Sequence, residues 1–166
     1  RGDLDGARRK LEHALKLEKD FPEALNTLGN ILRDQKKFAA ALKIYSRAVK
    51  IGLAVGGVFA NRGDVLRCIG NLDAAEADCR KAIELDSDLA AGHGNLAAVL
   101  MDRKDWEGAY LELKMAIRID PQEPVYSINL SKILTELGKP KDALQVAETA
   151  ISLCPSSAAA LNALGN

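Results

Sequence analysis

The chain repeats itself every 34 residues. Two alanine series carry this register, and successive members of each series are 34 residues apart. The first series is Ala7, Ala41, Ala75, Ala109 and Ala143, and the second is Ala14, Ala48, Ala82, Ala116 and Ala150. No insertion breaks the phase from Gly2 to Asn166. A fixed period of this length is typical of a protein built from stacked copies of one small unit.

Each repeat contains two helical patterns. In residues 22–55, apolar side chains recur at helical spacing on both sides of the polar segment 33–37. Two helices of roughly 13 residues joined by a short turn form an αα-hairpin. Later repeats place Gly70 and Gly138 at the same turn, where glycine suits a helix C-terminus. One hairpin cannot bury its apolar face alone, so neighbouring hairpins are expected to stack.

These residues resemble the tetratricopeptide repeat (TPR) family over the whole chain. The residues that carry the resemblance in the first full repeat are Leu25, Leu28, Gly29, Leu32, Phe38, Ala41, Tyr45 and Ala48. Pro121 and Pro155 supply the family's closing proline, whereas Lys19, Leu53 and Ser87 depart from it. The resemblance implies an all-α fold, a right-handed superhelical α-solenoid of antiparallel helix hairpins.

The register also predicts the domain organisation, a single array over residues 1–166. The full repeats are expected at 22–55, 56–89, 90–123 and 124–157, after the second helix of a partial repeat at 1–21 and before the start of a further repeat at 158–166. Leu161 and Leu164 would be poorly covered at such an end. We therefore expect a fragment of a longer array, or self-association of the chain through its uncapped ends.

The composition excludes several classes of protein. Lys plus Arg and Asp plus Glu each number 23, and aromatic residues make up only 4%. Zero net charge and few stacking rings argue against a nucleic-acid partner. No apolar run approaches the roughly 20 residues of a membrane span, and no signal peptide is visible. Three cysteines without CxxC spacing favour free thiols and hence a cytoplasmic location.

No catalytic motif is visible, so we expect no reaction and no cofactor in this chain. His13 and His93 lie far apart in the repeat phase, which argues against a metal site. His93 and Cys79 stand where other repeats carry apolar residues, so packing is the expected role of both. Arg62 occupies a leucine position and must reach solvent or a carboxylate.

Function is expected on the first helix of each repeat, which lines the concave groove in the TPR resemblance. The candidate partner-binding residues there are Asn26, Asn30, Asp34, Asn61, Asp64, Asn95, Asp102 and Asn129. Asn61, Asn95 and Asn129 form a row spaced by 34 residues. Because an amide offers both donors and an acceptor, such a row can pair with the backbone of an extended peptide. The row looks like the asparagine ladder in the TPR superhelix of O-linked N-acetylglucosamine transferases.

A second TPR binding mode does not fit the residues. Some family members clamp the C-terminal carboxylate of heat-shock chaperones with two asparagines and several cations. Asn30 and Asn61 match the two amides, but Asn26, Ala91 and Asn95 occupy the cationic places. Without those cations a desolvated carboxylate has no compensation, which argues against this clamp.

We therefore predict a protein–protein interaction scaffold that binds an extended protein or peptide segment. Two alternatives remain open. One is a substrate-recruiting arm of a larger enzyme, such as a glycosyltransferase, and the other is a structural self-assembly module.

Overall fold

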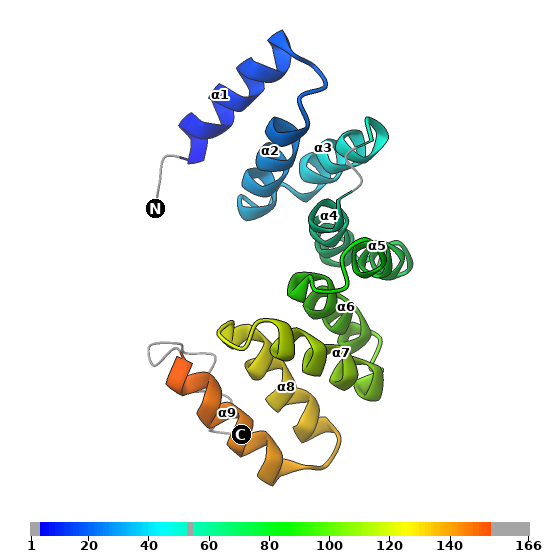
Figure 1. Cartoon of the computed structure of the whole chain (residues 1–166), viewed down its shortest axis with the longest axis vertical. Coiled ribbons are helices and arrows are strands. Elements are labelled where there is room, and N and C mark those ends of the chain that lie inside the picture. Colours follow the sequence, from blue (N-terminus) through cyan, green and yellow to red (C-terminus); the bar gives the residue numbers. More distant parts are fainter. Residues whose placement is uncertain (1–3, 53–54, 154–166) are drawn as a thin grey trace. The chain divides into compact units, whose positions relative to one another are not determined.

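The computed structural model describes residues 4–52 and 55–153, and within them it contains nine α-helices and no strand (Figure 1). The helices are α1 (Leu4–Leu17), α2 (Pro22–Asp34), α3 (Phe38–Lys50), α4 (Gly56–Cys68), α5 (Leu72–Leu85), α6 (Ala90–Asp102), α7 (Trp106–Ile119), α8 (Pro124–Glu136) and α9 (Pro140–Leu153). The all-α prediction is confirmed. The expected repeat start at 158–166, with Leu161 and Leu164, lies outside the described residues.

The helices fall into two compact units, Arg1–Ser87 and Asp88–Asn166. In the first unit, consecutive helices from α1 to α5 pack against one another, and α2 also touches α4. In the second unit, α6 packs against α7, α7 against α8, and α8 against α9. Both units are thus built from helix hairpins whose neighbours share a core, as the 34-residue period predicts.

The first unit packs closely because small residues face large ones. Ala41 and Ala48 are fully buried, as is the side chain of Tyr45 between them. A Cβ atom added to Gly29 would lie only 2.5 Å from the Tyr45 ring. The ring therefore rests directly on the α2 backbone, and this close approach accounts for glycine at that repeat position.

The second unit uses the same device with other residues. Val99, Leu113 and Ile133 fill its interior, and Ala97, Ala109 and Ala116 have no exposed surface. A Cβ atom on Gly94 would overlap the Tyr126 ring. Both alanine series of the sequence thus mark places where two helix axes come close together.

The turn inside each hairpin has one residue with left-handed backbone conformation. These residues are Lys36, Gly70, Lys104 and Gly138, with φ of 58°, 82°, 62° and 70°. At Gly70 the backbone N–H donates to the Arg67 carbonyl, and the following N–H donates to the Leu66 carbonyl. This pair of bonds is the Schellman motif that ends a helix. The glycine prediction is confirmed at two turns, whereas lysine takes the same conformation at the other two.

Candidate functional site

Two of the predicted asparagines meet on neighbouring first helices of the first unit. Asn30 lies on α2 and Asn61 lies on α4, and both are partly exposed. The Asn61 Nδ2 donates to the Asn30 Oδ1 over 3.0 Å. The sequence separates these residues by 31 positions, so the stacking of the two hairpins creates the contact.

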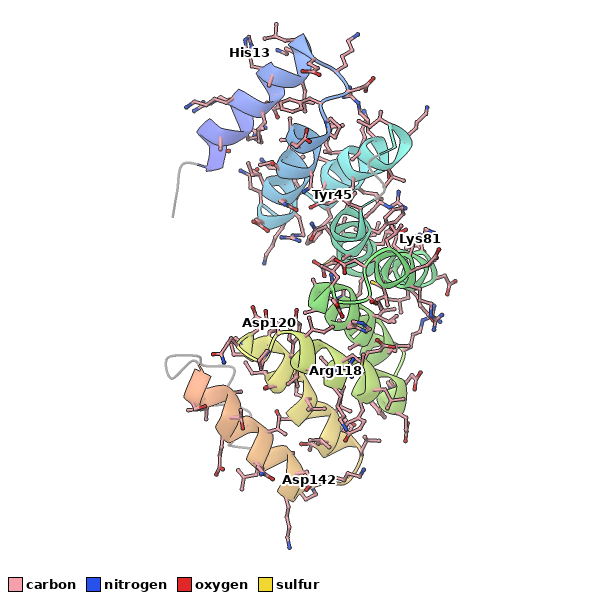
Figure 2. All side chains as sticks on the ribbon, viewed as in Figure 1. His13, Tyr45, Lys81, Arg118, Asp120 and Asp142 are labelled. Carbon is pink, nitrogen blue, oxygen red and sulfur yellow. The ribbon has the colours of Figure 1, made fainter. Side chains whose placement is uncertain are left out.

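On one side, the Asn30–Asn61 pair is hydrogen-bonded to a buried residue of the core. The Tyr45 hydroxyl on α3 donates to the Asn30 Oδ1 over 2.6 Å, and Tyr45 itself is labelled in Figure 2. Burial raises the pKa of Tyr45 to about 12, although the Arg33 charge works in the opposite direction. The hydroxyl therefore keeps its proton at neutral pH and acts as a donor.

On the other side the pair reaches a cation that the sequence did not single out. The Arg33 Nη1 donates to the Asn61 Oδ1 over 2.7 Å. Arg33 also pairs with Asp34 over 3.1 Å, and Asp34 was among the predicted residues. On α4, Asp64 pairs with Arg67 over 3.5 Å. We define the donor relay as the chain of side chains Tyr45, Asn30, Asn61 and Arg33.

Four further predicted residues differ in how far they are buried. Asn26 is partly buried, and its enclosed Oδ1 has no hydrogen-bond partner in residues 4–52 and 55–153. Asn95 on α6 and Asn129 on α8 are partly buried in the second unit, where Asp102 is exposed. A continuous row from Asn61 to Asn129 stays a prediction.

Three residues at apolar repeat positions have well-defined surroundings. Arg62 finds a carboxylate, as expected, and that carboxylate belongs to Asp78 on α5. His93 is buried, and its Nδ1 lies 2.7 Å from the Glu112 Oε2, a partner that the sequence did not reveal. Burial raises the pKa of the Cys79 thiol to about 12. Cys79 is therefore a packing residue and not an activated nucleophile.

The described residues give no sign of two other kinds of site. In this part of the chain, no three His, Cys, Asp or Glu side chains gather as a metal ion would require. Across the same residues, none of the helices combines the length and the apolar composition needed to cross a membrane.

Helix hairpins at 34-residue spacing, with small residues at their contacts, define a helical-repeat protein. Models of the tetratricopeptide repeat match residues 1–52, 57–89 and 126–157. These matches cover more than half of the chain, so the chain belongs to the tetratricopeptide repeat family.

Known relatives share this repeat. The Hsp70-Hsp90 organizing protein 1 of Glycine max is 22% identical over 137 residues, which are 82% of this chain and 24% of the relative. The Hsc70-interacting protein 1 of Drosophila melanogaster is 32% identical over 89 residues, 54% of this chain and 24% of the relative. The chain thus spans about a quarter of the length of these relatives.

A solved structure shows the same fold. The crystal structure of YrrB, a TPR protein with an unusual peptide-binding site, gives a TM-score of 0.74 at 20% identity. The match covers 99% of this chain and 84% of YrrB. At this identity the likeness establishes the all-α solenoid fold and nothing about the ligand.

Proposed function

We propose that the chain is a protein-interaction module that binds an extended polypeptide segment along the first helices of its hairpins. The observation that carries this proposal is the contact between Asn30 and Asn61, 3.0 Å apart on α2 and α4. Both amides are partly exposed, and each is held by a fixed neighbour. Preorganised polar groups of this kind bind a ligand with little loss of side-chain entropy.

The relatives support a binding role. One is named for organising Hsp70 and Hsp90, another for interacting with Hsc70, and YrrB is described by a peptide-binding site. For this chain we propose the shared feature alone, a polypeptide ligand. The cation beside its amide pair is Arg33, and not one of the three positions that a chaperone carboxylate clamp would use.

The proposal also includes a binding role for residues of the second unit and the absence of a catalysed reaction. Asn95 and Asn129 continue the register of Asn61, so we propose that they also contact a polypeptide ligand. We also propose that the chain binds without catalysing a reaction. Its buried thiol fits this role, because burial holds the pKa of Cys79 near 12 and keeps the group protonated.

The test begins with a selection that works before any partner is identified. Random 12-residue peptides displayed on phage are selected for binding to the wild-type chain. The selected peptides are then synthesised, and their affinity is measured by fluorescence anisotropy. We expect Asn61→Ala to weaken these peptides by about fivefold to tenfold, the effect of one lost hydrogen bond at a partly buried site. The double variant Asn95→Ala with Asn129→Ala should weaken them at least as much.

The matched control is Lys43→Ala on the exposed surface of α3, which should leave affinity unchanged. Circular dichroism establishes that each variant remains helical. Selected peptides that bind all the asparagine variants as tightly as the wild type would contradict the proposal. A loss confined to Lys43→Ala would instead move the binding surface to the second helices.

A further inference from the structure

We infer that Arg33 fixes the direction of the Asn61 and Asn30 side-chain amides, so that this site presents hydrogen-bond donors only and takes uncharged carbonyl groups. The inference rests on the proposed function, because it names the chemistry that the same site recognises. It assigns to Arg33 the role of a specificity-determining residue.

The direction follows from the chemistry of arginine. A guanidinium group has donors and no acceptor, and it stays charged at any pH a protein experiences. The Asn61 atom that faces Arg33 Nη1, at 2.7 Å, must therefore be the carbonyl oxygen. The Nδ2 of Asn61 is then left to face Asn30, where it meets the Oδ1 at 3.0 Å. One permanent cation thus orients two amides in series.

Both amide oxygens are already engaged in this arrangement, the Asn30 Oδ1 by two donors and the Asn61 Oδ1 by one. The Asn30 Oδ1 accepts from the Asn61 Nδ2 and from the Tyr45 hydroxyl, and the Asn61 Oδ1 accepts from the Arg33 guanidinium. The Asn30 Nδ2 meets no acceptor in residues 4–52 and 55–153, and the Asn61 Nδ2 uses one of its two hydrogens. The lone pair that the Asn61 Oδ1 keeps lies beside the Arg33 guanidinium, so the groups of the pair that face a ligand are N–H donors.

The charges around the donor relay select between two kinds of acceptor. Arg33 is paired with Asp34, and on α4 Arg67 is paired with Asp64. The four charges cancel, and two of the side chains are carboxylates that would repel an anionic ligand. A carboxylate entering here gains no net positive field. A neutral carbonyl meets the donors without that opposition.

The ligand class is therefore a polypeptide backbone that offers its carbonyl oxygens. The Asn30–Asn61 pair does not need an N–H group from the ligand, so the ligand residue bound there can be a proline. This differs from a bidirectional asparagine ladder, in which each amide serves one carbonyl and one N–H of the ligand.

The experiment uses the full chain and three small probes. The side-chain amide signals of Asn30 and Asn61 are followed by NMR during titration with N,N-dimethylacetamide, acetate and methylammonium. These probes are a neutral acceptor without an N–H group, a charged acceptor and a charged donor. For the wild type we expect dimethylacetamide to shift both signals most and methylammonium to shift them least.

Substitution of Arg33 then tests its role directly. Arg33→Glu places an acceptor opposite Asn61, so both amides should turn over. The Asn30 Oδ1 should then become available to a ligand, and methylammonium should become the probe with the largest shift. Arg33→Lys keeps a donor there and should preserve the wild-type order. Arg33→Met introduces the residue that the chain has at the equivalent repeat position, Met101. This change removes the orienting charge and should abolish the preference for one probe over the others. It serves as the test if Arg33→Glu unfolds by circular dichroism.

Three results overturn the inference. They are a larger shift with acetate than with dimethylacetamide in the wild type, an unchanged probe order in Arg33→Glu, and the absence of any shift up to the solubility of the probes. None of these measurements uses a peptide. If the probes behave as expected while peptide selection fails, the proposed function is wrong and the donor-only site stands. If selected peptides need Asn61 but Arg33→Glu leaves the probe order unchanged, the inference alone fails.

Discussion

Arg62 on α4 donates two hydrogen bonds to Asp78 on α5, over 2.5 and 2.7 Å, at repeat positions that hold Leu28 and Ile44 in the preceding hairpin. The Arg62 and Asp78 side chains are only 18% and 10% exposed. The guanidinium also lies 5.3 Å from the centre of the Phe59 ring. An ion pair thus replaces an apolar contact at an equivalent place in the repeat.

Removing one member of this pair should be costly, because the other charge then remains buried and unpaired. We expect Asp78→Ala to lower the free energy of unfolding by about 3–5 kcal/mol. The double variant Arg62→Leu with Asp78→Ile copies the preceding hairpin and should return stability to within about 1 kcal/mol of the wild type or above it. Urea unfolding followed by circular dichroism measures both. A double variant as unstable as Asp78→Ala would show that shape, and not charge, decides this contact.

The contact between Gly29 and Tyr45 leads to a second prediction. Because an added Cβ would lie 2.5 Å from the tyrosine ring, Gly29→Ala should destabilise the chain by about 1–3 kcal/mol through overpacking. Gly57 has nothing within 4 Å of its Cβ site, so Gly57→Ala should instead stabilise α4 by about 0.5–1 kcal/mol. Thermal unfolding of both variants provides the comparison.

The second unit suggests a second substitution that should compensate for Gly29→Ala. Ala97 and Leu113 occupy the same two repeat positions in the second unit, and both are fully buried. Combining Gly29→Ala with Tyr45→Leu should therefore cost less than the sum of the two single changes. Additive effects would mean that the tyrosine ring is not what the new methyl group meets.

The turns inside the hairpins carry a third prediction. Lys36 and Lys104 adopt the left-handed conformation that Gly70 and Gly138 adopt at the same repeat position. A residue with a side chain is disfavoured there, so Lys36→Gly should raise the free energy of unfolding by about 0.5–1 kcal/mol. Gly70→Lys should lower it by a similar amount. Urea unfolding midpoints that move in the opposite directions would contradict this account of the turn.

The repeat register explains why the fold could be predicted and part of the site could not. Residues that recur every 34 positions, such as Ala41 and Ala75, mark helix contacts, and these contacts depend only on the register. The identity of the residue that pairs with Arg62 does not depend on the register alone. An arginine at position 62 requires either solvent or a carboxylate, and only the packing of α4 on α5 selects Asp78.

Arg33 was missed for a related reason. A long, charged side chain at an exposed helical position has many possible partners, and the contact with Asn61 spans 28 residues of sequence. A usable signal was present, because Arg67 and Asn95 repeat both the residue types and the spacing of Arg33 and Asn61, whereas the next repeat keeps the spacing but has Met101 in place of the arginine. The enclosure of the Asn26 Oδ1 is likewise a result of packing that its place in the repeat does not reveal.

The buried thiol of Cys79 predicts a specific loss of stability in alkali. Burial raises the pKa of Cys79 from an ordinary value near 9.0 to about 12, so the folded chain keeps a proton that the unfolded chain releases. The stabilising contribution is complete below pH 9 and is lost as the pH rises towards 12. The free energy of unfolding should fall by up to about 1.4 kcal/mol per pH unit for this one proton. Tyr45 adds to the loss only above pH 10, because its pKa rises from 10.0 to about 12.

The window from pH 8 to pH 10 therefore isolates Cys79. Cys79→Ala copies Ala147, the residue at the same repeat position in the last described hairpin, and it removes the titrating thiol. Urea midpoints of the wild type should decline across this window, whereas those of the variant should stay flat until about pH 10, the ordinary range of tyrosine and lysine titration. The exposed thiol of Cys68 should react with iodoacetamide at pH 8 in both proteins. Parallel midpoint curves for the two proteins would show that Cys79 does not control stability in alkali.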